Sequence, residues 1–241
     1  MAQKDWFVSW FDTPYYHILY KHRNNSEAQA FMKNLVQKLQ LNKEQLLLDL
    51  ACGKGRHAIF LNLLGYNVTG ADLSKNNIAF AKKYENERLQ FFEHDMRDSF
   101  STKYDIILNL FTSFGFFEDD NDDILVLKNI KKGLNEGGLA VVDFMNSNKV
   151  VNQLIQQEAV TIEGITFNIS RYIKDGFIVK EISFIADNES HTYYEKVKIL
   201  PLEKIKSYLK KAGFSIKYLF GDYDLNEFNK EESDRLILVL E

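Results

Sequence analysis

The sequence predicts an α/β fold, with a doubly wound parallel sheet, helices on both of its faces and an inserted antiparallel β subdomain. Three observations indicate this class. Between residues 46 and 145, short apolar runs alternate with amphipathic segments, which is the pattern of parallel strands joined by helices. A loop with two glycines follows the first apolar run. Beyond residue 150 the hydrophobic pattern changes to period two, which is typical of antiparallel strands.

The first part of the chain predicts the parallel sheet. Residues 5–20 are dense in aromatic side chains, and residues 24–40 have the apolar spacing of a helix with Ser26 as its N-cap. Ser74 is expected to cap a second helix, over residues 75–87. The remaining elements expected here are strands at 46–50, 66–72, 89–95, 104–111 and 138–145, and helices at 53–64 and 119–134.

The second part predicts antiparallel strands and a return to the main sheet. Alternating residues at 165–173, 176–187 and 191–200 are separated by turn signals at Asp175-Gly176 and Asp187-Asn188. A helix over residues 201–212 should end at Gly213. Residues 214–223 and 235–241 predict two final strands.

Composition narrows the classes of function. The 241 residues fit one large domain, or one domain with a substantial insertion. A net charge of −4 gives no electrostatic reason to expect a nucleic-acid partner. The single Cys52 cannot form an intrachain disulfide, so a cytoplasmic protein is expected. No apolar stretch approaches the ~20 residues of a membrane span, so no membrane contact is expected. The acidic run at 119–123 lacks the spacing of a calcium loop, so no metal is expected.

The glycine loop raises a question of ligand. Gly53, Gly55 and Ala58 have the G-x-G-x-x-A spacing of dinucleotide-binding proteins. However, Asp49 precedes the loop by four residues and would repel a pyrophosphate. Asp72 and the aspartate at the end of the next strand, Asp95, should meet it at the same edge of the sheet. Three carboxylates instead favour a cationic ligand with a ribose diol, and S-adenosylmethionine is such a molecule.

Each carboxylate then has a chemical role. Asp49 is expected to face the methionyl ammonium, directly or through water. Asp72 should accept hydrogen bonds from the ribose hydroxyls, and Asp95 from the adenine amine. Leu73 and Met96 can enclose the base between them, with the backbone N–H of Met96 offered to its ring.

The run LLLDLACGKGRHAIFLNLLGYNVTGADLS, with EHDMRD, YDIILNLFTSFGFF and LNEGGLAVVDFMN after it, resembles class I S-adenosylmethionine-dependent methyltransferases. Within them it is similar to a small bacterial and archaeal group with an aromatic N-terminal segment, FTSFG after the fourth strand and a β-rich insertion after the fifth. The resemblance implies a Rossmann-like, seven-stranded sheet of order 3-2-1-4-5-7-6 whose last strand is antiparallel. Arg56 departs from the small residue that many relatives outside the group carry there.

The resemblance also implies an organisation in three parts. Residues 1–40 form an N-terminal helical and aromatic lid. Residues 41–150 and 201–241 form the cofactor-binding core, and residues 151–200 form the antiparallel insertion. We expect the insertion to cover the active-site edge, and it also offers a surface for a homodimer.

The acceptor is expected to be a small molecule. The place after the fourth strand that holds (D/N)PPY in amino-methyltransferases of adenine or glutamine reads Asn109-Leu110-Phe111-Thr112-Ser113 here. Cytosine C5 methylation needs a cysteine beside that strand, whereas Cys52 lies in the glycine loop. Methyl transfer from a sulfonium needs alignment more than a fixed triad, and a general base only when the acceptor arrives protonated.

Three groups of candidate site residues result. The cofactor-binding candidates are Asp49, Ala51, Gly53, Gly55, Arg56, Asp72, Leu73, Asp95, Met96, Asn109, Tyr20 and Arg23. The substrate-binding candidates are Tyr15, Thr112, Ser113, Phe114, Asn146 and Tyr193. The catalytic candidates are Tyr16 and His17, the latter because the ordinary pKa of histidine suits a base near neutral pH.

Two other functions are compatible with the fold. One is a non-catalytic protein that binds S-adenosylmethionine or docks a partner through the insertion. The other is an NAD(P)-dependent oxidoreductase, against which Asp49 and Asp95 argue. The acceptor atom, the use of a base and the oligomeric state stay open at this point.

Overall fold

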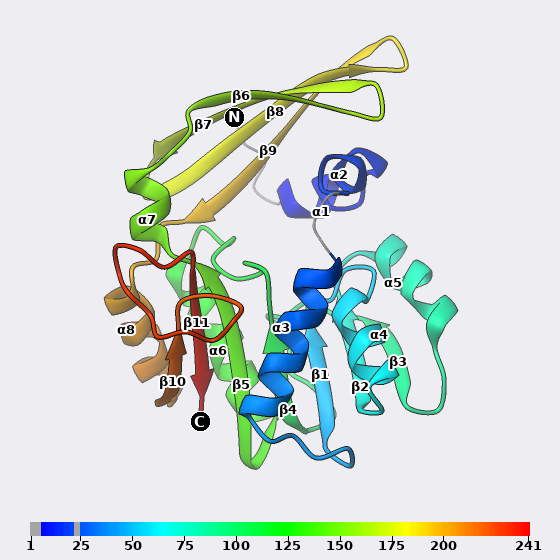
Figure 1. Cartoon of the computed structure of the whole chain (residues 1–241), viewed down its shortest axis with the longest axis vertical. Coiled ribbons are helices and arrows are strands. Elements are labelled where there is room, and N and C mark those ends of the chain that lie inside the picture. The colour runs from blue at the N-terminus through cyan, green and yellow to red at the C-terminus, as the bar shows by residue number, and fades with distance from the viewer. Residues whose placement is uncertain (1–5, 22–24) are drawn as a thin grey trace.

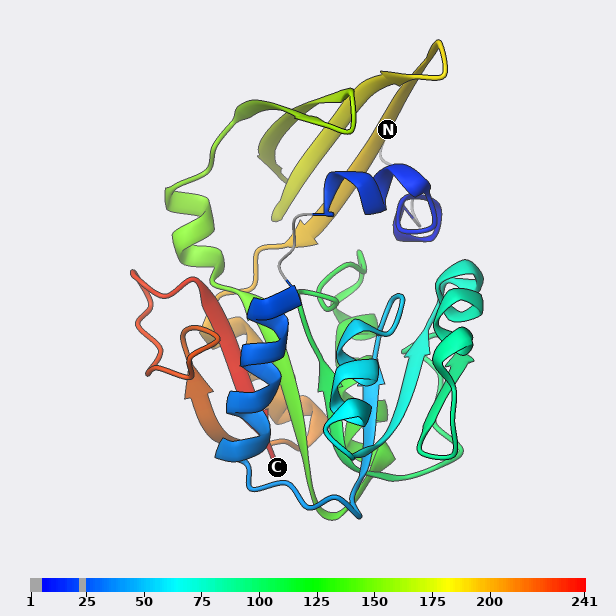
Figure 2. The same cartoon turned by 45° about the vertical axis from the view of Figure 1, so that its right-hand side comes forward.

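The computed structural model describes residues 6–21 and 25–241. The chain forms two sheets, a large one flanked by helices and a smaller one that stands beyond its carboxyl edge (Figure 1). Helices α1 (Trp6–Trp10) and α2 (Pro14–Leu19) lie between the two sheets (Figures 1 and 2). In these described residues, no helix is both long and apolar enough to cross a membrane.

The large sheet has the order β3-β2-β1-β4-β5-β11-β10. Its first five strands along the sheet are parallel, and β11 runs antiparallel to both of its neighbours, β5 and β10. This confirms the predicted sheet, with β10 and β11 as its sixth and seventh strands. The bounds are β1 (Leu46–Leu50), β2 (Asn67–Asp72), β3 (Leu89–Glu93), β4 (Tyr104–Asn109), β5 (Leu134–Met145), β10 (Ile216–Phe220) and β11 (Arg235–Leu240).

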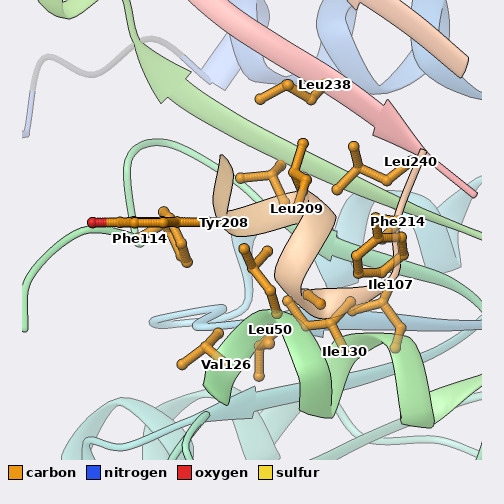
Figure 3. Packing of buried hydrophobic residues seen from close by; sticks show 14 of the residues in the cluster. Leu50, Ile107, Phe114, Val126, Ile130, Tyr208, Leu209, Phe214, Leu238 and Leu240 are labelled. Atoms are coloured by element: carbon orange, nitrogen blue, oxygen red, sulfur yellow. The ribbon is translucent and has the colours of Figure 1, made fainter. Parts of the chain in front are cut away.

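Helices cover both faces because successive strand residues point to opposite sides. On one face, side chains such as Leu47 pack against α3 (Asn25–Lys38), α4 (Arg56–Leu63) and α5 (Lys75–Ala81). On the other face, side chains such as Leu48 pack against α6 (Asp120–Gly133) and α8 (Leu202–Ala212). Figure 3 shows this second core, where Ile130 of α6 and Leu209 of α8 meet the sheet.

Several predicted boundaries are wrong by a few residues. Ser26 lies inside α3, which begins at Asn25, so it is not the N-cap. The helix after the glycine loop starts at Arg56, because Gly53 and Gly55 adopt left-handed φ values of 57° and 82° that no helix accepts. Helix α5 ends at Ala81, followed by a 3₁₀ turn over Lys82–Tyr84. Ser74, in contrast, caps α5 as predicted, accepting from the Asn77 N–H at 3.0 Å.

The smaller sheet is an antiparallel meander after the short helix α7 (Ser147–Asn152). Its strands are β6 (Gln157–Ile162), β7 (Ile165–Lys174), β8 (Phe177–Ala186) and β9 (Glu189–Lys198). The pattern did not predict β6, whose residues are mostly exposed. One face of the sheet packs on the aromatic side chains of α1 and α2, with Phe167, Ile182 and Phe184 against Trp6 and Trp10. The sheet and these two helices together form a roof over the carboxyl edge of the large sheet.

Candidate functional site

A cavity of about 1590 Å³ lies at the carboxyl edge of the large sheet. Its floor comes from the ends of β1 to β4 and the loops that follow them. Its roof comes from α1, α2 and β9, and a third side comes from the loop between β10 and β11. The fold therefore brings together residues from both ends of the chain at the edge where ligands bind in open α/β sheets.

The loop after β1 is shaped by close backbone approach. Ala51, Gly53 and Gly55 all have left-handed φ values, of 62°, 57° and 82°. A Cβ at Gly55 would lie 2.7 Å from the Phe91 ring, whereas nothing lies within 4 Å of a Cβ at Gly53. Packing against Phe91 thus leaves no room for a side chain at Gly55. Gly53 faces open space and lines the cavity.

Asp49 is a buried carboxylate at the base of this loop. Its side chain is 1% exposed, and its Oδ2 accepts from the Ala58 N–H at 3.1 Å. Among the described residues it makes no ion pair. Burial raises the pKa of Asp49 to about 7. Burial disfavours the ionised form of Asp49. A cationic ligand in the cavity would stabilise that form.

Asp72 connects the glycine loop to the next strand. Its Oδ2 accepts from the Gly53 N–H and its Oδ1 from the Ser74 N–H, both at 2.8 Å. Burial raises the pKa of Asp72 above its ordinary value. The carboxylate is thereby held in one orientation beside the cavity, where Leu73 also contributes to the wall.

Asp95 lies beyond β3 and is paired with Arg97. The guanidinium Nη2 lies 2.6 Å from Oδ2, and Nε lies 3.0 Å from Oδ1. Burial alone raises the pKa of Asp95, but the hydrogen bonds from Arg97 outweigh it and leave that pKa below its ordinary value. Asp95 is therefore an ionised carboxylate with both oxygens engaged, and its neighbour Met96 lines the cavity with it.

The loop after β4 has two consecutive residues in the left-handed region, Phe111 (φ 59°) and Thr112 (φ 61°). Such backbone is costly outside glycine and needs support from its surroundings. Asp143 supplies it: its Oδ2 accepts from the Phe111 N–H at 2.8 Å, and its backbone oxygen accepts from the Thr112 N–H at 3.0 Å. Arg235 donates to Asp143 Oδ1 at 2.8 Å and to Thr112 Oγ1 at 3.0 Å.

The roof contributes aromatic and acidic groups. His17 lines the cavity, and burial together with the nearby Lys54 lowers its pKa to about 4. Tyr20 also lines it and donates to Glu195 of β9 at 2.6 Å. Trp6, Phe7 and the loop residue Phe116 add rings to the wall. The upper side of the cavity thus combines aromatic rings with polar groups, among them the carboxylates of Asp12 and Glu195.

The cavity brings together most of the candidate residues. Those that line it are Asp49, Ala51, Gly53, Arg56, Asp72, Leu73, Asp95, Met96, Thr112, Ser113, Tyr16, His17 and Tyr20. Arg23 lies outside the described residues.

Six candidates lie outside the cavity lining. Gly55 packs on Phe91, and Asn109 and Phe114 are buried, at 1% exposure each. The other three make contacts elsewhere: Asn146 donates to the backbone oxygens of Lys230 and Ser233, Tyr15 to Asp187 on the β8–β9 turn, and Tyr193 stacks on Trp10. Each of these six therefore has a packing or anchoring contact in the protein.

Sequence reasoning missed the residues that reach the cavity from distant parts of the chain. They are Glu27, Phe111, Glu195, Asp222, Tyr223, Asp224, Asp234 and Arg235. Phe111 lies two residues after the end of β4 and could have been included with its neighbour Thr112. Glu195 is one polar residue within an alternating strand, and Arg235 begins the last strand, so neither has a motif that would have indicated it.

Comparison with known proteins gives one family and several relatives. The model of the family described as tellurite resistance protein TehB matches residues 14–154. YqeM of Bacillus subtilis (strain 168), named as a methyltransferase, is 26% identical over 204 residues, which cover 79% of this chain and 81% of YqeM.

Two solved structures show the same fold. An S-adenosylmethionine-dependent methyltransferase from Clostridium acetobutylicum has a TM-score of 0.80 at 19% identity, covering 94% of this chain and 95% of that one. The sugar N-methyltransferase KedS8 from Streptoalloteichus has a TM-score of 0.71 at 19% identity, covering 93% of this chain and 92% of that one.

Proposed function

The chain belongs to the TehB family and is an S-adenosylmethionine-dependent methyltransferase, and on that premise we propose that it methylates a small-molecule amine. The observation that carries the proposal is the set of carboxylates around one cavity at the carboxyl edge of the sheet. When bound, S-adenosylmethionine supplies an electrophilic methyl group on a sulfonium. The protein has to bind that cation, orient the acceptor nitrogen and exclude water.

The residues on the floor of the cavity fit this cofactor. Asp49 is buried and makes no ion pair with another described residue, so an ammonium group would supply its missing countercharge. Two backbone N–H groups hold the Asp72 carboxylate in one orientation. A carboxylate oriented in this way suits hydrogen bonding to the ribose diol. We propose that Asp95 and Met96 contact the adenine, with the carboxylate of Asp95 held in place by Arg97.

The charge of the remaining wall favours an amine as the acceptor. Among the described residues that line the cavity, nine are Asp or Glu and five are Lys or Arg. Glu27, Asp222, Asp224, Asp234 and Glu195 are acids that the cofactor roles above do not use. Their field attracts a cation and repels an oxyanion such as tellurite. KedS8, which has the same fold, is a sugar N-methyltransferase, and this is consistent with an amine as the acceptor here.

We further propose the organisation that the sequence suggested. Residues 1–40 act as a lid, residues 151–200 as a cover inserted into the core, and the chain belongs with the small group that carries FTSFG after the fourth strand. Tyr16 and His17 remain candidates for a catalytic role. The cytoplasmic location and a homodimer through the insertion also stay predictions.

The test is methyl transfer itself. The protein is incubated with S-adenosylmethionine that carries a labelled methyl group and with separate panels of amines, alcohols, thiols and tellurite. We expect labelled product from one or more amines, with S-adenosylhomocysteine formed in equal amount. Transfer only to tellurite or to a hydroxyl would overturn the amine. Tight cofactor binding without transfer to any acceptor would favour a non-catalytic role.

A further inference from the structure

We propose that Tyr20 and Glu195 form a proton relay that removes a proton from the acceptor amine before methyl transfer. This inference rests on the proposed function, because an amine that enters as an ammonium has no lone pair for attack. Both side chains line the cavity. They come from parts of the chain 175 residues apart, the end of α2 and the middle of β9.

Glu195 is held from two sides. Its Oε1 accepts from the Trp10 Nε1–H at 2.8 Å and from the Tyr20 hydroxyl at 2.6 Å. Its Oε2 lies 3.7 Å from Lys180 Nζ. The side chain of Glu195 is 16% exposed and that of Lys180 is 13% exposed, so the pair is largely withdrawn from water. A carboxylate held in this way on a cavity wall is oriented rather than free to rotate.

Lys180 sets the direction of the relay. Its ammonium donates a hydrogen bond to the Tyr20 oxygen and also lies 4.6 Å from the centre of the Tyr20 ring. The Tyr20 oxygen accepts this bond from Lys180, and its own proton is directed at Glu195. Negative charge on the phenol oxygen is stabilised by the neighbouring ammonium. Tyr20 can therefore receive a proton at its oxygen as it passes its own proton to Glu195.

The chemical balance is simple. The acceptor ammonium gives one proton to the Tyr20 oxygen, and the Tyr20 hydroxyl proton moves to Glu195. The acceptor nitrogen then uses its freed lone pair to form a bond to the methyl carbon, as the carbon–sulfur bond breaks and its electron pair stays on sulfur. The neutral Glu195 finally returns its proton to solvent. No oxidant or other co-reactant is needed.

His17 is the competing base, but its ring is already engaged beside the proposed ribose site. Burial and Lys54 lower its pKa to about 4, and its ring is hydrogen-bonded to Asn77 on α5, beside the proposed ribose site. The charged and titratable groups that contact Glu195 in the described part of the chain include Lys180 on β8 and Tyr20. Arg171, which is paired with Lys180 on the adjacent strand β7, donates a hydrogen bond to Glu158. Glu195 is thus the acceptor of the Tyr20 hydroxyl bond, with Lys180 as its counter-ion.

The test compares Glu195→Gln with Glu158→Gln. The amide oxygen at 195 can still accept the bonds from Trp10 and Tyr20, but it cannot take a proton. Glu158→Gln makes the same chemical change on the same sheet, away from the cavity. With an amine acceptor at pH 7, we expect kcat to fall by about 100-fold or more in Glu195→Gln. We expect Glu158→Gln to stay within about twofold of the wild type.

A purely structural role is excluded by two further readouts. Calorimetry should show that Glu195→Gln binds S-adenosylhomocysteine within about twofold of the wild type. The loss of kcat should shrink as the pH rises above the pKa of the acceptor amine, because the amine is then already deprotonated. Tyr20→Phe should reproduce both effects, and it keeps the test open if Glu195→Gln does not fold.

Three results would overturn the relay. They are a wild-type kcat in Glu195→Gln and Tyr20→Phe, an equal loss in Glu158→Gln, or a loss in Glu195→Gln that does not vary with pH. A wild-type protein that methylates no amine would instead remove the proposed function on which the relay rests.

Discussion

At the scale of single residues, Asp49 is a buried carboxylate whose ionisation destabilises the ligand-free protein, and we propose that it faces the cationic part of the cofactor. Its pKa of about 7 means that the folded protein binds a proton there more tightly than the unfolded chain, whose carboxyl has an ordinary pKa near 3.8. The resulting stabilisation is fully present below about pH 4 and is lost as the pH rises through 7. At pH 8 the ionised side chain costs on the order of 4 kcal/mol.

Asp49→Asn should therefore separate stability from binding. We expect the ligand-free variant to be more stable than the wild type at pH 8, with the difference vanishing near pH 4. Its affinity for S-adenosylmethionine should fall by at least about tenfold. Urea unfolding at the two pH values and calorimetric titration measure the two quantities. A variant that is less stable at pH 8, or that binds the cofactor normally, would contradict the role of Asp49.

Asp72 should be needed for the cofactor for a different reason. Asp72→Ala removes the charge-assisted acceptor for the ribose hydroxyls and also releases the N–H groups of Gly53 and Ser74. We expect at least a tenfold weaker affinity for S-adenosylhomocysteine by calorimetry. Glu93→Ala, at an exposed carboxylate on β3 that does not line the cavity, is the matched control. Unchanged affinity in a folded Asp72→Ala would exclude the ribose assignment.

At the scale of elements, the loop after β4 depends on β5 and β11. Asp143 is fully buried, and its carboxylate accepts hydrogen bonds from the Phe111 N–H, the Arg235 guanidinium and the Tyr223 hydroxyl. The pair Asp143–Arg235 thereby links the ends of two antiparallel strands to the two left-handed residues that face the cavity. We infer that the loop keeps its shape because these strands hold it.

Removing one partner of the Asp143–Arg235 pair should lower the free energy of unfolding by more than removing both partners. Arg235→Met leaves a buried, unpaired carboxylate, and we expect a loss of about 3–5 kcal/mol in unfolding free energy at pH 8. The double variant Asp143→Asn, Arg235→Met should recover part of the stability. Denaturant unfolding of the four proteins in the cycle measures this, and strictly additive losses would contradict the coupling.

The elements also show what sequence can and cannot predict. The strands of the large sheet could be predicted because buried parallel strands are continuous apolar runs. Their order came from the resemblance to class I methyltransferases. β6 was missed because its side chains are mostly exposed and its period is weak. Asp49 and Asp72 could be inferred from their place beside the loop. Glu195 and Arg235 could not, because only tertiary packing brings them to the cavity.

At the scale of the whole molecule, the segment that holds α1 and α2 is attached both to the smaller sheet and to the large-sheet domain. Tyr15 and Trp10 tie α1 and α2 to the smaller sheet through Asp187 and Glu195. On the other side, Asp12 accepts from the Ser74 hydroxyl and, at 2.7 Å, from the Asn76 amide at the start of α5. We infer that Asp12 holds the proposed lid, with α1 and α2, against the start of α5 next to the proposed ribose site.

Asp12→Ala should loosen this contact. We expect S-adenosylhomocysteine to enter and leave faster, with a dissociation rate raised by about tenfold. Stopped-flow fluorescence of Trp6 and Trp10 in the lid offers the measurement. Asp187→Ala, which breaks a lid contact with the smaller sheet only, is the control. Exchange rates equal to those of the wild type in Asp12→Ala would show that the lid does not limit access.

We propose that the acid-lined edge of the large sheet binds S-adenosylmethionine rather than a dinucleotide. Calorimetric titration of the protein with S-adenosylhomocysteine, and separately with NAD and NADP, tests it most directly. We expect one-to-one binding of S-adenosylhomocysteine that is weakened at least about tenfold by Asp72→Ala, and no heat of binding with either dinucleotide. Saturable binding of NAD or NADP, with none of S-adenosylhomocysteine, would contradict it.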